Sequence, residues 1–212
     1  MKITKYQHAC LVIEKDTTTI VIDPGSFSKD FVLPNKVDAV IITHEHPDHL
    51  DESLMLKILE ANPAATIFAH ESIVGRFTNY TAIAAHINEP FVIGATSLRF
   101  FGGQHAEIAS SIPVPANLAV LIDDHFYYPG DSFTLPENIQ VKELALPVSA
   151  PWLKISEVMD FLVAIKPLFV FPTHDAILSD EGKALVDRIL GGVAAGQNSQ
   201  YKRLDGASIE LS

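Results

Sequence analysis

The stretch Thr43-His44-Glu45-His46-Pro47-Asp48-His49 places three histidines and one aspartate within seven residues. It overlaps the end of an apolar run that predicts a buried strand over residues 37–43. Imidazole and carboxylate groups are ligands that zinc, manganese and iron accept, and a loop can direct several of them to one point. A polar loop with incidental histidines is the alternative interpretation, but neither solubility nor packing requires four such groups together. The stretch therefore predicts a metal site at the end of a strand.

Three more candidate ligands, His105, Asp131 and His174, lie far along the chain, and each follows a predicted strand. Alone, each has an ordinary alternative as a core histidine, a turn aspartate or a surface histidine. Open sheets covered by helices place ligand sites at the carboxyl ends of strands. Together with the histidine-rich stretch, these residues supply five histidines and two carboxylates, enough to surround two metal ions.

Hydrophobic patterning predicts the secondary structure around these residues. Strands are expected at residues 10–14, 18–23, 37–43, 66–69, 97–101, 118–122, 126–128, 141–146, 168–171 and 207–211. Helices are expected from an N-cap at Asp51 to Asn62-Pro63, at about 70–77, at about 156–166, and from an N-cap at Ser179 to Gly191-Gly192. A strand-rich first part followed by alternating strands and helices predicts layered sheets with outer helices.

Composition indicates a compact folded protein. The chain has 212 residues, of which 48% are apolar and 19% charged, and we expect residues 1–212 to form a single domain. No apolar run approaches the roughly 18 residues of a membrane span, and the first residues lack the pattern of a signal peptide. We therefore expect a cytoplasmic protein with no membrane partner, and the sequence leaves its oligomeric state open.

The net charge bears on which partners the chain can bind, and the cysteine content bears on disulfides. The net charge of −11 disfavours a broad basic surface that would hold nucleic acid, although bound metal could still make a local pocket positive. The single cysteine, Cys10, cannot form an intramolecular disulfide, and its apolar neighbours predict a buried core thiol. We therefore expect a small-molecule partner and no nucleic acid.

The order and context of the candidate ligands resemble the metallo-β-lactamase superfamily, and the resemblance covers essentially the whole chain. It rests on the histidine-rich stretch, His105, Gly130-Asp131-Ser132, Pro172-Thr173-His174 and the early aspartate in Val21-Ile22-Asp23-Pro24. Two further segments, His8-Ala9-Cys10 and Ala150-Pro151-Trp152-Leu153-Lys154, resemble the ascorbate-6-phosphate lactonase-like branch of predicted metal-dependent hydrolases. That branch usually has glycine before the first histidine, where this chain has Gln7.

The resemblance implies an α/β fold (α+β in some classifications), a four-layer αββα sandwich with two divalent metal ions at one edge. The implied ligands are His44, His46 and His105 for the first ion, Asp48, His49 and His174 for the second, and Asp131 as the bridge. Zinc is the favoured metal, and manganese and iron are alternatives that these ligand types also accept.

Such a centre is typical of hydrolases. Two ions roughly 3.5–4 Å apart share a bridging water whose pKa falls towards 7, which supplies hydroxide as a nucleophile. Asp131 would set the spacing, and Asp48 is expected to orient the nucleophile and relay its proton, so both count as catalytic candidates. Two divalent ions contribute about +4, and Asp48, Asp131 and hydroxide remove about three charges, leaving about +1. The expected substrate is therefore an anionic ester, lactone or phosphodiester.

Four other residues are candidates for orienting a ligand or contacting substrate: His8, Asp23, Trp152 and Lys154. Asp23 is expected to orient a ligand histidine, although it also suits a turn. His8 fits a core histidine as well as a site-facing one. Trp152 and Lys154 follow a strand end, which suits substrate contact as well as ordinary packing or solvation.

Two alternatives to a small-molecule hydrolase remain. A nuclease or RNA-processing metalloenzyme uses similar metal chemistry, but the charge of −11 disfavours it. A redox or non-catalytic metal-binding protein of the same fold is the other alternative.

Overall fold

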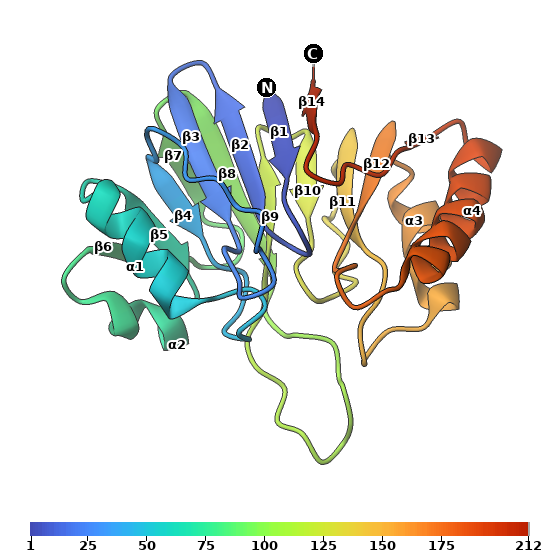
Figure 1. Ribbon diagram of the computed structural model, residues 1–212, viewed down its shortest axis with the longest axis horizontal. Coiled ribbons are helices and arrows are strands. Elements are labelled where there is room, and N and C mark those ends of the chain that lie inside the picture. The colour runs from blue at the N-terminus through green and yellow to red at the C-terminus, as the bar shows by residue number, and fades with distance from the viewer. Residues whose placement is uncertain (212) are drawn as a thin grey trace.

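The computed structural model describes residues 1–211, which form two seven-stranded sheets packed face to face. Helices α1 (Glu52–Ala61) and α2 (Glu71–Val74) lie on the outer side of one sheet, and α3 (Ile155–Ile165) and α4 (Asp180–Gly196) lie on the outer side of the other (Figure 1). This arrangement is the predicted four-layer αββα sandwich, so the fold prediction is confirmed.

The first sheet has the strand order β14-β1-β2-β3-β4-β5-β6. Its strands are β1 (Lys2–Lys5), β2 (Leu11–Lys15), β3 (Thr18–Ile22), β4 (Ala39–Ile41), β5 (Thr66–Ala69), β6 (Thr81–Ala84) and β14 (Ser208–Glu210). Strands β2 and β3 form the predicted N-terminal hairpin, and β14 is the predicted edge strand. Because β1 and β3 both run antiparallel to β2, and β4 runs parallel to β3, the carboxyl ends of β1, β3 and β4 meet at one edge.

The second sheet has the strand order β13-β12-β11-β10-β9-β8-β7. Its strands are β7 (Pro90–Ile93), β8 (Thr96–Gly102), β9 (Leu118–Ile122), β10 (Phe126–Tyr128), β11 (Glu143–Pro147), β12 (Phe169–Thr173) and β13 (Gln200–Tyr201). Strands β8 and β10 are both antiparallel to β9, while β10, β11 and β12 are parallel. The carboxyl ends of β8, β10 and β12 therefore also lie at one edge.

Three apolar layers hold the sandwich together. The layer between the sheets includes Ile22, Phe68, Phe100 and Phe171, each at most 1% exposed. One outer layer joins α1 and α2 to the first sheet, and the other joins α3 and α4 to the second. Cys10 is buried in the former, as predicted. Burying apolar surface on both faces of each sheet provides the main stabilisation and fixes the strand ends relative to one another.

The predicted helix starts are confirmed, whereas the predicted end of the last helix is wrong. Asp51 Oδ1 accepts from Leu54 N–H at 2.9 Å, and Ser179 Oγ accepts from Gly182 N–H at 3.2 Å. Helix α4 does not end at Gly191-Gly192 but continues to Gly196. Each interior glycine costs roughly 1 kcal/mol relative to alanine. Packing of the buried face of α4 against the second sheet offsets this cost.

Two other segments differ from prediction. The helix expected at about 70–77 is a single α-helical turn, α2, followed by the 3₁₀ turn Gly75–Phe77. Strands β1, β6, β7 and β13 have no predicted counterpart. They are short and lie at or near sheet edges, where pairing with neighbouring strands outweighs weak local pattern.

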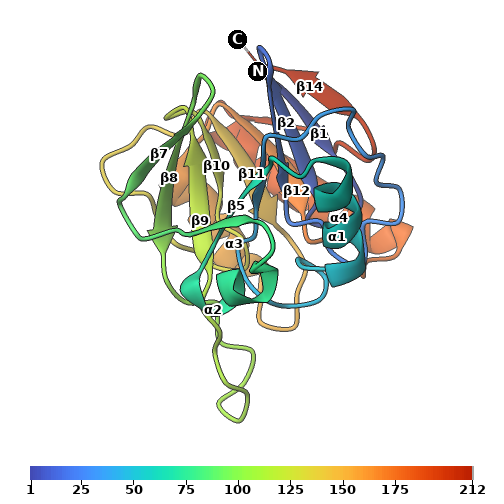
Figure 2. The ribbon, with the colours of Figure 1, turned by 90° about the vertical axis from the view of Figure 1, so that its left-hand side faces the viewer.

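The loop at residues 103–117, between β8 and β9, projects away from the two sheets in both views (Figures 1 and 2). Within residues 1–211, no helix has both the length and the apolar character needed to cross a membrane.

Candidate metal centre

The candidate ligands converge at the edge where the carboxyl ends of the strands meet. The histidine-rich stretch follows β4, His105 follows β8, Asp131 follows β10 and His174 follows β12. Four segments that are far apart in sequence thus deliver polar side chains to one place, as expected for a ligand site in a layered α/β structure.

Two glycines permit the close backbone approach at this edge. A Cβ on Gly25 would lie 1.7 Å from the carbonyl oxygen of Asp48. Gly130 has a φ of +60°, and its Cβ would lie 2.4 Å from Asn117 Oδ1. A side chain at either position would therefore displace Asp48 or Asp131.

The ligand atoms form three overlapping groups, within each of which they lie no more than 4.8 Å apart. The groups are His44, His46 and His105; His8, Asp48, His49 and His174; and His44, His49 and Asp131. The first group is the set implied for the first ion. The second contains the set implied for the second ion, with His8 in addition.

Asp131 lies between these groups, as a bridging carboxylate would. Its Oδ1 is 3.2 Å from His49 Nε2. Its Oδ2 is 3.3 Å from His105 Nε2 and 3.0 Å from His174 Nε2. One carboxylate thus faces imidazoles from both proposed ion positions.

The buried Nε2 atoms of four histidines lack a hydrogen-bond partner among residues 1–211: His44, His49, His105 and His174. Asp131 Oδ1 also lacks one within these residues. Unpaired buried polar atoms are costly, and several aimed at one point indicate a missing partner. Nitrogen and oxygen donors in this arrangement fit divalent metal ions. Packing alone would not direct so many unpaired donor atoms to one point.

The opposite ring nitrogen, Nδ1, of each of these histidines is held by the protein. The partners are Thr43 Oγ1 for His44, Asp23 Oδ2 for His49, the Ala106 carbonyl for His105 and the Ser149 carbonyl for His174. A proton on Nδ1 satisfies these acceptors and leaves the Nε2 lone pair directed into the centre. This is the usual way in which proteins fix the tautomer of ligand histidines.

Asp23 lies beneath the ligands as the acceptor for several buried donors. Its Oδ2 is 2.7 Å from His49 Nδ1, and Thr43 donates to it through Oγ1 at 2.7 Å. Tyr128 OH donates to the same oxygen at 3.0 Å, and Thr43 N–H donates to Asp23 Oδ1 at 2.8 Å. The structure therefore places Asp23 where it orients His49.

Asp131 is held by two residues outside the ligand set. Asn117 Oδ1 accepts from Asp131 N–H at 3.0 Å, and Trp152 Nε1–H donates to Asp131 Oδ2 at 3.0 Å. The Trp152 ring also lies near the His105 ring, with centroids 5.9 Å apart. Trp152 therefore contacts a candidate ligand directly.

Lys154 lies outside the ligand groups, and its contact with substrate stays a prediction. It is exposed at the start of α3, where its backbone N–H donates to Glu157 Oε2 at 3.0 Å. No side-chain contact from Lys154 to the candidate ligands is present within residues 1–211.

Sequence reasoning missed Asn117 and Tyr128, both fully or almost fully buried. Asn117 directly precedes β9 and Tyr128 is the last residue of β10, so in the sequence each looks like an ordinary residue at the boundary of an apolar strand. Only the folded arrangement shows that Asn117 supports the loop carrying Asp131 and that Tyr128 reaches Asp23.

Burial and charge set the protonation of the ligands. Burial lowers the pKa of His44 and His46, so both rings are neutral and can donate a lone pair. Burial alone would raise the pKa of Asp131, but the charges of His49 and His174 outweigh it and hold the pKa well below its ordinary value. The centre therefore presents ionised carboxylate among imidazoles.

Burial and neighbouring charged groups also have opposite effects on the pKa values of the residues implied for the second ion. Burial alone would raise the pKa of Asp48, but the imidazoles of His174 and His8 beside its carboxylate outweigh it and lower the pKa. Burial alone would lower the pKa of His174, but Asp131 and Asp48 outweigh it and raise the pKa to about 9. Asp131 and Asp23 likewise raise the pKa of His49 well above its ordinary value. A cation binding here would compete with protons on these rings.

Comparison with known proteins identifies related chains. A Mycobacterium tuberculosis protein is 35% identical over 190 residues, which cover 87% of this chain and 89% of that protein. A protein of Hyperthermus butylicus named UPF0173 metal-dependent hydrolase is 32% identical over 158 residues, covering 66% of this chain and 65% of that one.

A solved structure and a family model also match this chain. A solved structure described as a metallo hydrolase from Ignicoccus hospitalis has a TM-score of 0.76 at 20% identity, covering 100% of this chain and 99% of that one. The family model described as the β-lactamase superfamily domain matches residues 2–174, which include every candidate ligand. The chain therefore belongs to the β-lactamase superfamily of metal-binding αββα proteins.

Proposed function

We propose that this protein is a cytoplasmic metal-dependent hydrolase with a two-ion centre, most simply a zinc centre. The observation that carries the proposal is the cluster of four unpaired buried Nε2 atoms around the Asp131 carboxylate, three of which lie 3.0–3.3 Å from its oxygens. The related Hyperthermus and Ignicoccus proteins are named as metal-dependent or metallo hydrolases, which supports the same activity.

His44, His46 and His105 would hold one ion, Asp48, His49 and His174 the other, and Asp131 would contact both. Bound ions of this kind supply Lewis acidity and lower the pKa of a coordinated water. Asp48 is the more exposed of the two carboxylates, at 22% against 4% for Asp131. This position suits Asp48 for orienting an attacking water and taking up its proton, while Asp131 fixes the spacing of the centre.

The substrate class proposed is a small anionic ester, lactone or phosphodiester. Two divalent ions and the two carboxylates, together with a hydroxide, leave about one positive charge at the centre. This local positive charge would favour an anionic substrate over a neutral one, although the chain as a whole carries −11. The resemblance to the ascorbate-6-phosphate lactonase-like branch favours the same substrate class.

The test is a hydrolysis screen of the zinc-loaded protein with phosphodiesters, lactones and carboxylated esters. We expect activity that chelation abolishes and zinc restores, and that Asp131→Asn lowers by at least about a hundredfold. Asp160→Asn, on the exposed side of α3, is the matched control and should retain activity. Hydrolysis that survives both chelation and Asp131→Asn would refute the proposal.

The same screen separates the two alternatives. Strongly salt-dependent cleavage of single-stranded RNA in place of small substrates would favour a nuclease. Coloured, iron-loaded protein that hydrolyses none of the compounds would favour a redox role.

A further inference from the structure

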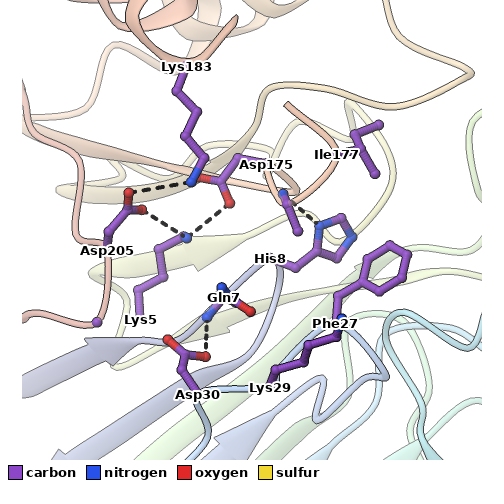
Figure 3. Close-up of a pocket in the computed structure, with 12 residues that line it drawn as sticks. Lys5, Gln7, His8, Phe27, Lys29, Asp30, Asp175, Ile177, Lys183 and Asp205 are labelled. Carbon is purple, nitrogen blue, oxygen red and sulfur yellow. Dashed lines mark hydrogen bonds and ion pairs between the residues drawn. The ribbon is translucent and has the colours of Figure 1, made fainter. Parts of the chain in front are cut away.

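A pocket of about 470 Å³ shares only His8 with the candidate ligand groups described above (Figure 3). We call it the Lys5 pocket. The side chains that define its chemistry are Lys5, His8, Phe27, Lys29, Ile177 and Lys183. They come from the last residue of β1 and the loop after it, the loop after β3, the loop after β12 and the first turn of α4.

The pocket adjoins the proposed second ion through His8. The ring of His8 lines the pocket, and its Nε2 is 3.0 Å from Asp48 Oδ2. Asp175 and Ala176, which also line the pocket, directly follow the candidate ligand His174. One side chain thus separates the pocket from the candidate ligands.

The side of the pocket nearest the centre is apolar. Phe27 is 37% exposed and Ile177 is 53% exposed, although both are large hydrophobic residues. The Phe27 ring packs edge-on against the His8 ring at a centroid distance of 5.0 Å, and Ile177 lines the same pocket (Figure 3). Exposed apolar side chains that line a concave site are typical of contact with a ligand's hydrocarbon part.

On the side away from the candidate ligands, the floor of the pocket carries the Lys5 ammonium group. Lys5 is only 1% exposed, and its Nζ donates to Asp175 Oδ1 at 3.1 Å, with Asp205 Oδ1 farther away at 3.8 Å. Asp175 is also paired with Arg203, so two cations share its charge. An ammonium group has three protons to donate, and Lys5 therefore retains capacity for another acceptor.

Two more lysines stand on the walls. Lys183 Nζ is 3.5 Å from Asp205 Oδ2, and Lys29 forms no ion pair within residues 1–211. The carboxylates on the walls are each engaged: Asp30 accepts from Gln7 N–H at 2.8 Å, and Asp175 and Asp205 are in ion pairs. The three lysines and three aspartates of the lining balance in formal charge, and Lys5 and Lys183 are in ion pairs with Asp175 and Asp205. Lys29 has no such pair within residues 1–211, so it is the lysine of the pocket with its charge available to an anionic group.

We propose that the Lys5 pocket binds the non-reacting end of the substrate, a short aliphatic segment that terminates in a carboxylate. The scissile group would lie at the metal centre, the aliphatic segment would pass Phe27 and Ile177, and the carboxylate would be held by Lys29, Lys183 and Lys5. This inference rests on the proposed hydrolase function and adds a second point of recognition to it. Binding energy from the remote end would orient the scissile group at the centre.

The test uses calorimetric titration of the zinc-loaded protein with linear dicarboxylates from succinate to sebacate, each compared with the monocarboxylate of equal length. One carboxylate mimics the reacting group at the centre and the other occupies the pocket. We expect one chain length to bind at least about tenfold more tightly than its monocarboxylate. Removing zinc should abolish this preference, because only the pocket then remains to bind.

The variant Lys29→Gln/Lys183→Gln should lose the preference for the dicarboxylate and leave monocarboxylate binding within about twofold. Lys57→Gln, on the exposed side of α1, is the matched control and should keep the preference. Phe27→Ala with Ile177→Ala provides a second variant that leaves the lysines intact and should weaken binding of every chain length. Val163→Ala, an exposed residue of α3, is its control.

The inference is overturned if dicarboxylates of every length bind no more tightly than monocarboxylates. It is also overturned if the double lysine variant keeps the full preference. Failure of the hydrolase proposal looks different: the protein would bind dicarboxylates as described but hydrolyse none of the screened compounds. Conversely, hydrolysis of carboxylated esters with an unchanged KM in the double lysine variant would refute the pocket alone.

Discussion

His8 Nε2 lies 3.0 Å from Asp48 Oδ2, while the backbone N–H of Ala176 donates to His8 Nδ1 at 3.3 Å. Because Nδ1 accepts, the neutral ring carries its proton on Nε2 and donates it to Asp48. Burial lowers the pKa of His8 to about 4, which keeps the ring neutral at neutral pH. The His8 carbonyl also accepts from His174 N–H at 3.0 Å. His8 therefore holds two candidate ligands of the second ion in position, and in this tautomer it has no Nε2 lone pair for the metal.

His8→Ala should weaken binding of the second ion by about 10- to 100-fold, because Asp48 loses the donor that orients it. His8→Gln should restore part of this affinity, since its amide N–H₂ can donate to the same carboxylate. The measurement is competition with a chelator of known zinc affinity. If His8→Ala binds two ions as tightly as the unmodified protein, His8 does not position Asp48.

Asp23→Ala should lower the free energy of unfolding by about 3 kcal/mol or more, because it leaves buried donors of Thr43, His49 and Tyr128 without an acceptor. Tyr128→Phe removes one of these hydrogen bonds and should cost only about 1 kcal/mol. Urea denaturation in the presence of a chelator measures both effects without contribution from metal binding. Equal stability of the two variants would contradict this interpretation of Asp23.

Leu162→Ala should lower the free energy of unfolding by about 2–5 kcal/mol, because Leu162 is fully buried where α3 packs on the second sheet. Its neighbour Val163 is 57% exposed, so Val163→Ala should change stability by no more than about 0.5 kcal/mol. Thermal and urea denaturation of the two variants check the predicted orientation of α3. Similar losses in both variants would mean that this helix packs on a different face.

The lowered pKa of Asp187, a residue outside the metal centre, predicts that the stability of the fold depends on pH. Burial alone would raise the pKa of Asp187, but hydrogen bonds from Arg203 and Tyr201 outweigh it and lower the pKa. A carboxyl with a lowered folded-state pKa contributes stability that is present above its unfolded value of about 3.9 and disappears as the pH falls through the folded value.

Asp187→Asn should therefore cost about 1 kcal/mol at neutral pH, and the difference from the unmodified protein should shrink below about pH 4. Urea denaturation at a series of pH values measures this difference. A constant difference across the series would show that the ionised form of Asp187 contributes nothing.

Much of the fold could be predicted because its determinants are local. The apolar stripe of α3 and the alternation of β2 and β3 are visible in short windows, and the structure confirms these elements. The end of α4 could not be predicted from Gly191-Gly192, because its continuation depends on packing against the second sheet and not on glycine propensity. Tertiary contacts of this kind are invisible in a local window.

The candidate site likewise contains residues that the sequence indicates and residues whose roles only the folded structure reveals. Ligand residues such as His105 and His174 are prominent because titratable groups directly after apolar strands are uncommon. The role of His8 depends on a left-handed backbone with a φ of +66° and on a partner 40 residues away, so sequence alone left it between the core and the site. Asp175 is similar: its buried ion pair with Lys5 spans 170 residues. Such pairings follow from topology, which brings β1 beside the loop after β12.

Metal stoichiometry, measured by elemental analysis of zinc-supplemented protein, tests the two-ion centre most directly. We predict two zinc ions per chain, and one in His46→Ala, because His46 lies only in the first ligand group. His86→Ala, at an exposed histidine outside all ligand groups, should retain two. A single ion per chain in the unmodified protein, or two ions retained by His46→Ala with unchanged affinity, would contradict the division of ligands described here.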